Sequence, residues 1–451
     1  MKVDVLVAEI GSTTTIVNAF NLHRKPTGYV GRGFSATTVD SDVTIGLEKA
    51  IDDLKKNLNI DELLYDEMFA TSSAAGGLKI TVHGLVYEMT AKAAKQAALN
   101  AGANIHLVTA NLLEDEHVEQ IRNLKPNIII IAGGTNFGEK EVAYQNVLKV
   151  KDLNIPLIYG GNIENHHRLL KLNLAHLTIV DNVYPRVDDF NILPLRSAIY
   201  EIFEKHIIHA KGMHKINDMI KGHIIPTPGA VMETTLLLND LFNGVMTLDV
   251  GGATTDVHSV CEPKEIYRKY SDGEPLFKRT VEGDLGVYIN RMLVFEQANK
   301  VKLLKALDIN EKEAINLLKN EPFIPQTIKG INLIEFLTET CVHKALDRHI
   351  GDLKRVFTTN GMKVIPDGKD TSQVKAIFLT GGACLAHPNI EISIKDYLEN
   401  AVTKLVPHKN IAIFKDVDYI FSSLGVLSLT YRSEVLEILK KMFYGGIPHV
   451  S

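Results

Sequence analysis

The feature that most constrains this fold is a pair of short turns, rich in glycine and hydroxyl side chains, that each follow a strand-like run. The first turn reads EIGSTTT over residues 9–15, and the second reads DVGGATTD over residues 249–256. The runs before them, residues 3–7 and 245–248, are apolar and rich in β-branched side chains, which is typical of strands. We therefore expect both turns to lie at strand ends.

Both turns have the composition of a phosphate site. Glycine lets the backbone approach a ligand, and successive N–H groups and hydroxyls donate to phosphate oxygens. The candidate phosphate-binding residues are Gly11, Ser12, Thr13 and Thr14 in the first turn and Gly251, Gly252, Thr254 and Thr255 in the second. A carboxylate stands two residues before each first glycine, so Glu9 and Asp249 could hold the hydrated Mg²⁺ of a nucleoside triphosphate. Either turn alone could also be an ordinary hairpin.

A third glycine motif follows another apolar run near the end of the chain. Residues 376–380 read as a strand, and Gly381, Gly382 and Ala383 follow it. The three motifs in this order resemble the actin, Hsp70 and sugar-kinase ATPase superfamily, where they are the first phosphate loop, the second phosphate loop and the adenosine loop. The resemblance implies a two-lobed α/β fold with ribonuclease-H-like halves and, as cofactors, ATP and Mg²⁺. Many members of the superfamily carry Asp where this chain has Glu9.

Composition narrows the class of protein. With 451 residues the chain is long enough for two or three domains. A net charge of −5 gives no basic field of the kind that nucleic acid requires, and no apolar stretch has membrane-spanning length. We expect a cytoplasmic protein that binds neither nucleic acid nor membrane. The three cysteines are isolated from one another, so we expect core side chains rather than disulfides or zinc ligands.

The chain opens with a predicted meander and a helix. Strand signals lie at residues 3–9, 16–20 and 27–32. Apolar residues then recur at helical spacing over residues 43–58, with Ser41 as the expected N-cap.

Alternating strand and helix signals over residues 66–182 predict a parallel α/β unit. Its glycine turns at 133–134 and 160–161 fall at carboxyl ends of strands, where they could bind a ligand or simply turn into the next helix. We place the main boundary near residue 244. The predicted lobes are residues 1–244, which include this unit, and residues 245–451.

Later segments carry further predictions. Residues 333–356 show an amphipathic stripe typical of a long helix, and residues 363–373 have the composition of a surface loop. The last helix contains small residues at 422–427 that would suit close packing at a hinge.

Three acidic residues are further site candidates, because phosphoryl transfer depends mainly on placement and charge stabilisation. Asp249 and Glu233 are the candidate catalytic residues. Glu233 would orient the attacking water; the alternative is that Glu233 is a solvated carboxylate on a helix face. Asp256 could act on the metal ion indirectly, by holding one of the groups or waters that contact it, or it could cap its own turn. Glu282 resembles the ribose-side loop of the superfamily, although its Glu-Gly-Asp sequence could be only the entry to a helix.

Four longer strings carry a more specific resemblance. Residues 8–14, 31–39, 70–78 and 280–286 closely resemble the glutamate mutase accessory protein family, called GlmL or MutL and unrelated to mismatch repair. This resemblance implies an ATP-driven protein that maintains or reactivates adenosylcobalamin-dependent glutamate mutase, with the mutase subunits as partners. The string DVHSVC at 256–261 lacks the glycine of the Asp-x-His-x-x-Gly cobalamin signature, so we assign cobalamin to the partner. A small-metabolite kinase and a nucleotide-binding scaffold without hydrolysis remain alternatives.

Overall fold

The computed structural model describes residues 1–11, 14–38, 42–73, 78–207, 212–270, 275–358 and 361–444. The chain divides into two compact units. Unit 1 comprises residues 1–237, 273–275 and 420–451, and unit 2 comprises residues 238–272 and 276–419. Among the described residues no helix is long and apolar enough to cross a lipid bilayer.

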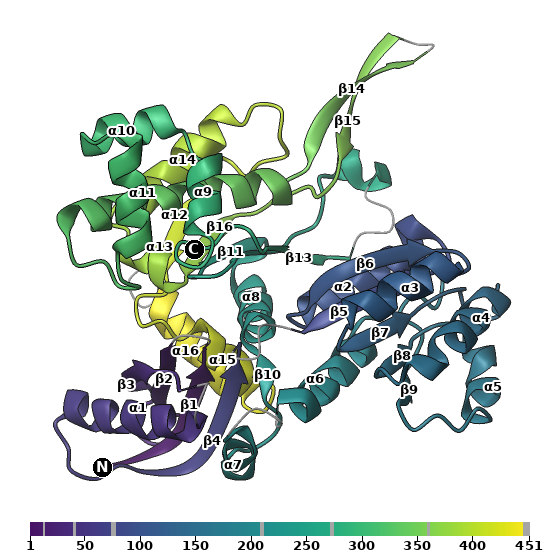
Figure 1. The fold of residues 1–451 in the computed structure, drawn as a ribbon, viewed down its shortest axis with the longest axis horizontal. Coiled ribbons are helices and arrows are strands. Elements are labelled where there is room, and N and C mark those ends of the chain that lie inside the picture. The colour runs from purple at the N-terminus through teal and green to yellow at the C-terminus, as the bar shows by residue number, and fades with distance from the viewer. Residues whose placement is uncertain are drawn as a thin grey trace. The chain divides into compact units, whose positions relative to one another are not determined.

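The first sheet of unit 1 has the strand order β3-β2-β1-β4-β10 (Figure 1). Its strands are β1 (Lys2–Ile10), β2 (Thr14–Asn21), β3 (Gly28–Ala36), β4 (Leu64–Ser72) and β10 (Ile225–Pro226). The first three form the predicted antiparallel meander, and β4 runs parallel to β1. Nearly every side chain of β1 is buried, because both faces of this central strand are covered.

Helix α1 (Val43–Leu58) packs on this sheet through its apolar face, as the periodicity predicts. Its N-cap is Asp42, whose side chain accepts a hydrogen bond from the N–H of Thr44 at 2.9 Å. The prediction of Ser41 as the cap was therefore wrong by one residue. The carboxylate at the next position accepts a hydrogen bond from a backbone N–H of the first turn, which has no partner within the helix. Ser41 itself lies outside the described residues.

The predicted parallel α/β unit is confirmed as a second sheet, with strand order β6-β5-β7-β8-β9 and only parallel pairs. Its strands are β5 (Lys79–Gly84), β6 (Asn104–Ala110), β7 (Ile128–Ile131), β8 (Leu157–Tyr159) and β9 (Leu177–Ile179). Its α-helices are α2 (Lys92–Asn100), α3 (Asp115–Leu124), α4 (Glu141–Val150) and α5 (His166–Leu170), with shorter turns at Tyr87–Ala91, Lys151–Leu153 and Ile163–Asn165. The sheet begins at β5 rather than at residue 66, because β4 pairs with β1 instead.

The remaining helices of unit 1 come from the middle and from the C-terminal part of the chain. They are α6 (Leu193–Ile207), α7 (Met213–Met219), α8 (Thr227–Phe242), whose last turn falls in unit 2, α15 (Phe421–Ser428) and α16 (Arg432–Tyr444). Helices α8 and α15 pack closely, as the small residues at 422–427 predict: a Cβ on Gly425 would lie 1.8 Å from the carbonyl oxygen of Ala230. Helices α15 and α16 therefore belong to unit 1, whereas the predicted second lobe runs to residue 451. The lobe boundary itself stays a prediction.

The sheet of unit 2 repeats the plan of the first sheet, with strand order β13-β12-β11-β16-β17. Its strands are β11 (Val245–Val250), β12 (Thr255–Val260), β13 (Phe277–Glu282), β16 (Ala376–Thr380) and β17 (Ala412–Lys415). Three strands form an antiparallel meander, and two further strands follow in parallel. The apolar core lies between this sheet and its helices. These helices are α9 (Arg291–Gln297), α10 (Lys300–Leu307), α11 (Glu311–Asn320), α12 (Ile328–His349), α13 (Gly382–Ala386) and α14 (Ile390–Asn400), with a short turn at Glu265–Tyr270.

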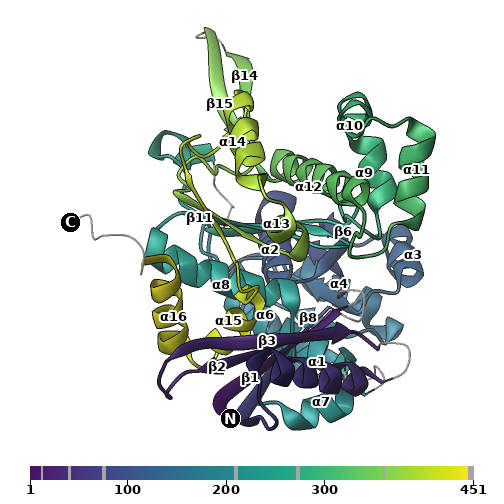
Figure 2. The same cartoon turned by 90° about the vertical axis from the view of Figure 1, so that its left-hand side faces the viewer.

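Unit 2 also carries a two-stranded hairpin, β14 (Asp352–Thr358) and β15 (Gly361–Asp367), which extends beyond the helices of its own unit (Figure 2). The predicted helical stripe over residues 333–356 is correct only as far as His349, where α12 ends. The predicted loop at residues 363–373 was wrong over β15. Leu353 and Val356 follow Ile350 at intervals of three residues, which continued the helical spacing by coincidence.

Candidate functional site

The first turn lies at a strand end, as predicted, between β1 and β2. The N–H of Gly11 donates to the carbonyl oxygen of Thr14 at 2.9 Å and closes the turn. A Cβ on Gly11 would lie 2.6 Å from that same oxygen, so a larger residue would open the turn. Ser12 and Thr13 lie outside the described residues.

The second turn joins β11 to β12 and closes in the same way. The N–H of Gly251 donates to the carbonyl oxygen of Thr254 at 2.9 Å. Within the described residues no hydrogen bond uses the N–H groups of Gly252 or Ala253, so both remain available as donors to an anion. Thr255 is fully buried, and its hydroxyl donates at 2.6 Å to a main-chain carbonyl in the loop after β13. This hydrogen bond of Thr255 therefore connects the second turn to the loop after β13.

The carboxylates Glu9 and Asp249 occupy equivalent positions in the two sheets. Each is the last residue but one of its strand, and the antiparallel registers of the two hairpins coincide residue for residue. Each also pairs with a threonine on the neighbouring parallel strand, Thr71 on β4 and Thr380 on β16. The two turns are thus the same structural element, built once in each unit.

The two carboxylates have different surroundings. Glu9 is only 7% exposed and accepts a hydrogen bond from the hydroxyl of Ser422 on α15. Asp249 is half-buried. Within the described residues no group of three or more His, Cys, Asp or Glu side chains could hold a metal ion. Mg²⁺ usually binds one or two carboxylates and keeps several waters. One carboxylate at each turn therefore fits a hydrated Mg²⁺ better than an ion that is held entirely by protein ligands.

The third motif lies against the second turn. Gly381 has a φ of 84°, and a Cβ there would lie 2.5 Å from the carbonyl oxygen of Val250 and 2.6 Å from Oδ1 of Asp249. Gly382 has open space around its Cα, because a Cβ there would meet nothing within 4 Å. Ala383 packs partly buried against the core of unit 2. The structure therefore brings two of the predicted motifs together within one unit.

Asp256 is 3% exposed and forms a buried ion pair with Arg279, a partner that no sequence pattern indicated. Oδ1 of Asp256 accepts from Nε and Nη2 of Arg279 at 3.1 and 2.7 Å, while Oδ2 accepts from the hydroxyl of Thr254 at 3.4 Å. A carboxylate engaged by a guanidinium has little capacity left for a metal ion. This geometry favours the turn-cap alternative for Asp256.

Glu282 is the last residue of β13 and pairs with Thr255 across the sheet, so it lies beside the second turn. Its carboxylate accepts a hydrogen bond from Arg348 at 2.5 Å, and Arg348 also binds Asp284 at 2.6 Å. Burial raises the pKa of Glu282, although Arg348 opposes this shift, whereas Arg348 holds the pKa of Asp284 at about 2. The alternative of a helix entry was wrong, because the next helix begins only at Arg291.

Glu233 lies on α8 and is 6% exposed, so the alternative of a solvated helix-face carboxylate was wrong. Its Oε1 lies 3.1 Å from Nη2 of Arg196 and accepts from the hydroxyl of Tyr200 at 3.4 Å. Burial raises the pKa of Glu233, and the charge of Arg196 opposes that rise. The role of Glu233 in orienting water stays a prediction.

The glycine turns of the parallel α/β unit pack tightly on one another. A Cβ on Gly134 would lie 1.7 Å from the carbonyl oxygen of Glu139, and one on Gly161 would lie 2.8 Å from that of Gly133. The side chain of Asn162 further donates to main-chain carbonyls in the turn after β7. Close contact between neighbouring loops explains these glycines, which favours the tight-turn alternative.

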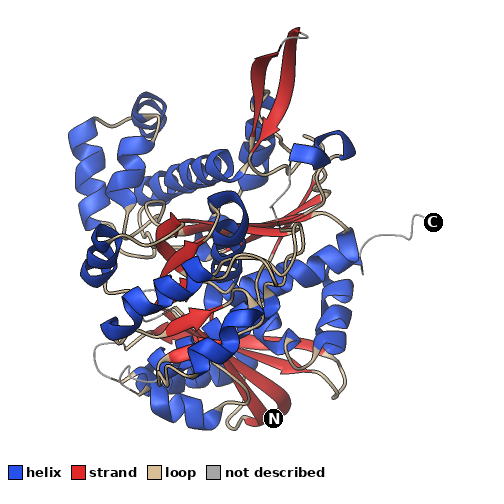
Figure 3. Cartoon of the chain, turned by 90° about the vertical axis from the view of Figure 1, so that its right-hand side faces the viewer, coloured by secondary structure: helices blue, strands red, loops and turns tan. Residues whose placement is uncertain are grey.

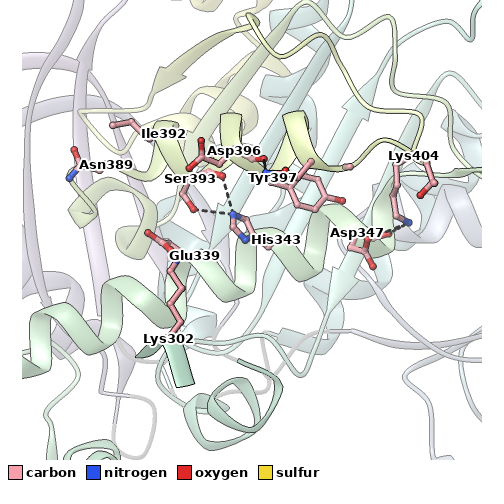
Figure 4. A pocket seen from close by; sticks show the side chains of 13 residues that line it. Lys302, Glu339, His343, Asp347, Asn389, Ile392, Ser393, Asp396, Tyr397 and Lys404 are labelled. Atoms are coloured by element: carbon pink, nitrogen blue, oxygen red, sulfur yellow. Dashed lines mark hydrogen bonds and ion pairs between the residues drawn. The ribbon is translucent and has the colours of Figure 1, made fainter. Parts of the chain in front are cut away.

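A surface cavity of about 690 Å³ opens between α10, α12 and α14 of unit 2 (Figure 4). His343 is hydrogen-bonded to the hydroxyl of Ser393 at 2.9 Å and stacks on Tyr397. At one end Lys404 forms an ion pair with Asp347 at 3.5 Å. No predicted site residue within the described ranges lines this cavity.

The duplicated sheets, the equivalent turns and the glycine that abuts the second turn define the class of protein: the chain has the two-lobed α/β fold of the actin-like ATPase superfamily, with ribonuclease-H-like halves and an additional parallel α/β unit in the first half. The chain belongs to the MutL protein family, whose model matches residues 5–443. It is 32% identical to "Protein MutL" of Clostridium tetanomorphum, over 97% of this chain and 98% of the relative. The family predicted from the motif strings is therefore confirmed.

Several solved structures align along most of the chain at low identity. A nucleotide-free acetone carboxylase structure has a TM-score of 0.40 at 11% identity, covering 94% of this chain and 70% of the other. The activator of 2-hydroxyisocaproyl-CoA dehydratase from Clostridium difficile with bound ADPNP has a TM-score of 0.31 at 9% identity, covering 99% of both chains. Likeness at this level carries no argument about ligands, and the fold assignment rests on the two matching sheets.

Proposed function

We propose that this chain is an ATP-binding, ATP-hydrolysing accessory protein that maintains or reactivates adenosylcobalamin-dependent glutamate mutase. The observation that carries the nucleotide part is the duplicated turn, closed by the same hydrogen bond in both units and preceded in each by a carboxylate. Membership of the MutL family supports the mutase as the partner.

In this proposal both turns hold one triphosphate. The N–H groups of Gly252 and Ala253 donate to phosphate oxygens, and Gly381 lets the nucleoside approach the second turn. Glu9 and Asp249 orient the waters around Mg²⁺, whose charge would offset that of the phosphates. Asp256 stays paired with Arg279 and holds the turn in shape.

Nucleotide state would act on the partner through the angle between the two lobes. A nucleotide that contacts both turns stabilises one arrangement of the lobes, and its loss stabilises another. Hinge closure around a ligand is a common switching mode. The mutase would then be loosened or restored by its different contacts with the two arrangements, while cobalamin itself stays with the mutase.

The decisive experiment measures phosphate release by the purified protein with and without glutamate mutase. We expect release that the mutase stimulates, and we expect Asp249→Ala to lower ATP affinity or turnover by at least about tenfold, since it removes one of two carboxylates at the ion. Glu262→Ala is the matched control, because Glu262 is an exposed carboxylate just after β12. Unchanged ATP affinity and rate in Asp249→Ala would reject the metal role.

If both turns bind the same nucleotide, substitutions in the two turns should not act independently on ATP binding. Glu9→Ala in unit 1 should weaken the same ATP binding as Asp249→Ala in unit 2, and the double variant should lose much less than the product of the two single effects. Fully independent effects would show that the turns serve separate ligands. ATP consumption that requires a small metabolite and yields its phosphoester would instead identify a kinase, and binding without turnover would identify a scaffold.

A further inference from the structure

The hairpin formed by β14 and β15, here called the hairpin arm, is a structural feature separate from the turns. Its base is tied to unit 2: the N–H of Leu353 donates to the carbonyl oxygen of Thr403 at 2.7 Å, and Lys404 forms an ion pair with Asp352 at 3.2 Å. Beyond this base, and among the residues that the structure describes, the two strands pair only with each other, and they extend away from the helices of unit 2 (Figure 1 and Figure 3). A lone two-stranded ribbon gains little stability from its own contacts.

One face of the distal arm is apolar and exposed. The register pairs Phe357 with Met362 and Arg355 with Val364, which places all four side chains on the same face. Phe357 is 84% exposed, Met362 is 55% exposed and Val364 is 50% exposed. Single exposed apolar residues are ordinary, but three adjacent ones on a projecting ribbon mark a contact surface.

The same part of the arm carries unpaired positive charge. Lys354 forms an ion pair with Asp367 at 2.5 Å nearer the base. Within the described residues no ion pair involves Arg355 or Lys363, and both are exposed. The whole chain has a net charge of −5, so this positive, apolar arm stands out from the overall charge of the chain.

We infer that the hairpin arm docks on a partner protein by inserting Phe357, Met362 and Val364 into an apolar groove with an acidic rim. The apolar side chains would supply the buried centre of the contact, and Arg355 on the same face would meet carboxylates at the rim. Lys363 pairs with Val356 on the opposite face, so it would add positive charge that speeds association. This inference rests on the proposed function, because the partner it names is the mutase of that proposal.

Two other occupants fit the arm less well. Two unpaired basic residues would contribute only about 1 kcal/mol each at an anionic membrane surface, which is too little for stable attachment. A second copy of the arm would bring like charges together across the ribbon edge, which is unfavourable.

The test compares the affinity of purified glutamate mutase subunits for this 451-residue chain and for three variants of it. Phe357→Ser with Met362→Ser should weaken binding by at least about tenfold, because truncating a buried aromatic anchor usually costs that much. Arg355→Glu with Lys363→Glu should slow association and invert its dependence on salt. Val301→Ser is the control, since Val301 is 79% exposed on α10. Basal phosphate release should be unchanged in all three variants.

The outcomes separate this inference from the proposed function. If the wild type neither binds the mutase nor releases phosphate, both fall. If the wild type binds the mutase and the Phe357→Ser, Met362→Ser variant binds within about twofold, only the docking role of the arm falls. Hydrogen exchange across β14 and β15 shows whether that variant keeps its hairpin; should it not, the charge-reversal variant decides. If the Phe357→Ser, Met362→Ser variant keeps its mutase binding but loses self-association or binding to phosphatidylserine vesicles, the arm contacts a second copy or a membrane instead.

Discussion

Gly381→Ala tests the packing of the third motif against the second turn. The added methyl group would lie 2.5 Å from the carbonyl oxygen of Val250 and 2.6 Å from Oδ1 of Asp249. Both contacts are far shorter than van der Waals distance, and the carbonyl belongs to a strand that pairs directly with β16. Strands β11 and β16 must therefore separate locally, and the carboxylate of Asp249 must turn away.

Two effects set the expected loss of stability in Gly381→Ala, backbone strain and overpacking. Gly381 has φ 84° and ψ 135°, a region that costs a residue with a Cβ roughly 1–3 kcal/mol. Overpacking of a filled site adds typically about 1–3 kcal/mol, so we expect unit 2 to lose about 2–6 kcal/mol. Gly382→Ala is the matched control: its methyl group meets nothing within 4 Å, and Ala is favoured over Gly in a helix by up to about 1 kcal/mol.

Because the chain has two units, a single unfolding free energy is poorly defined, and hydrogen exchange of β11 and β16 is the better assay. Exchange there should accelerate by about 30-fold or more in Gly381→Ala, which corresponds to at least about 2 kcal/mol, and remain near wild type in Gly382→Ala. Equal protection in both variants would refute the steric argument. ATP affinity should fall with Gly381→Ala as well, if Asp249 acts as proposed.

Two further predictions concern buried charges. Asp256→Asn should destabilise unit 2 by about 3–5 kcal/mol, because it removes the negative charge of a buried ion pair with the 1% exposed guanidinium of Arg279; a thermal midpoint equal to that of Glu262→Gln would contradict this. Burial lowers the pKa of His83 from an ordinary 6.5 to about 3, so the unfolded state binds the extra proton and stability should fall as pH drops from about 6.5 towards 3, by up to about 1.4 kcal/mol per pH unit. Hydrogen exchange of β5 against pH measures that slope, which His83→Gln should remove.

The sequence could predict those parts of the fold that are encoded locally. Apolar runs followed by glycine placed both turns at strand ends, and alternation of strand and helix signals identified the parallel unit. The hairpin arm was missed because Leu353 and Val356 follow Ile350 at intervals of three residues, a spacing that a helix also shows. The cap of α1 was misplaced by one residue because Ser41 and Asp42 are both good N-caps.

The partners of the site residues could not be predicted, because they come from distant segments. Ser422 reaches Glu9 from the far end of the chain, and its run of small residues predicted close packing rather than a hydrogen bond. Arg279 reads as an ordinary strand residue until the register of β12 and β13 places it beside Asp256. A sequence pattern thus identifies the groups that do chemistry, whereas long-range pairing decides which of them are free to do it.

The two halves use the same turn but close its flank differently. On β4, Ser72 pairs with Ile10, and its hydroxyl donates to the carbonyl oxygen of Ile10 at 3.1 Å. The next position in the equivalent register of unit 2 is Gly381, which has no side chain and lies against Val250 instead. The flank of the first turn is therefore closed by a serine side chain, while that of the second is closed by the backbone of Gly381, and open space begins one residue later, at Gly382. The asymmetric ligand of our proposal, with phosphates at one end and a nucleoside at the other, suits this difference, because the open space at Gly382 directly follows the residue that abuts the second turn.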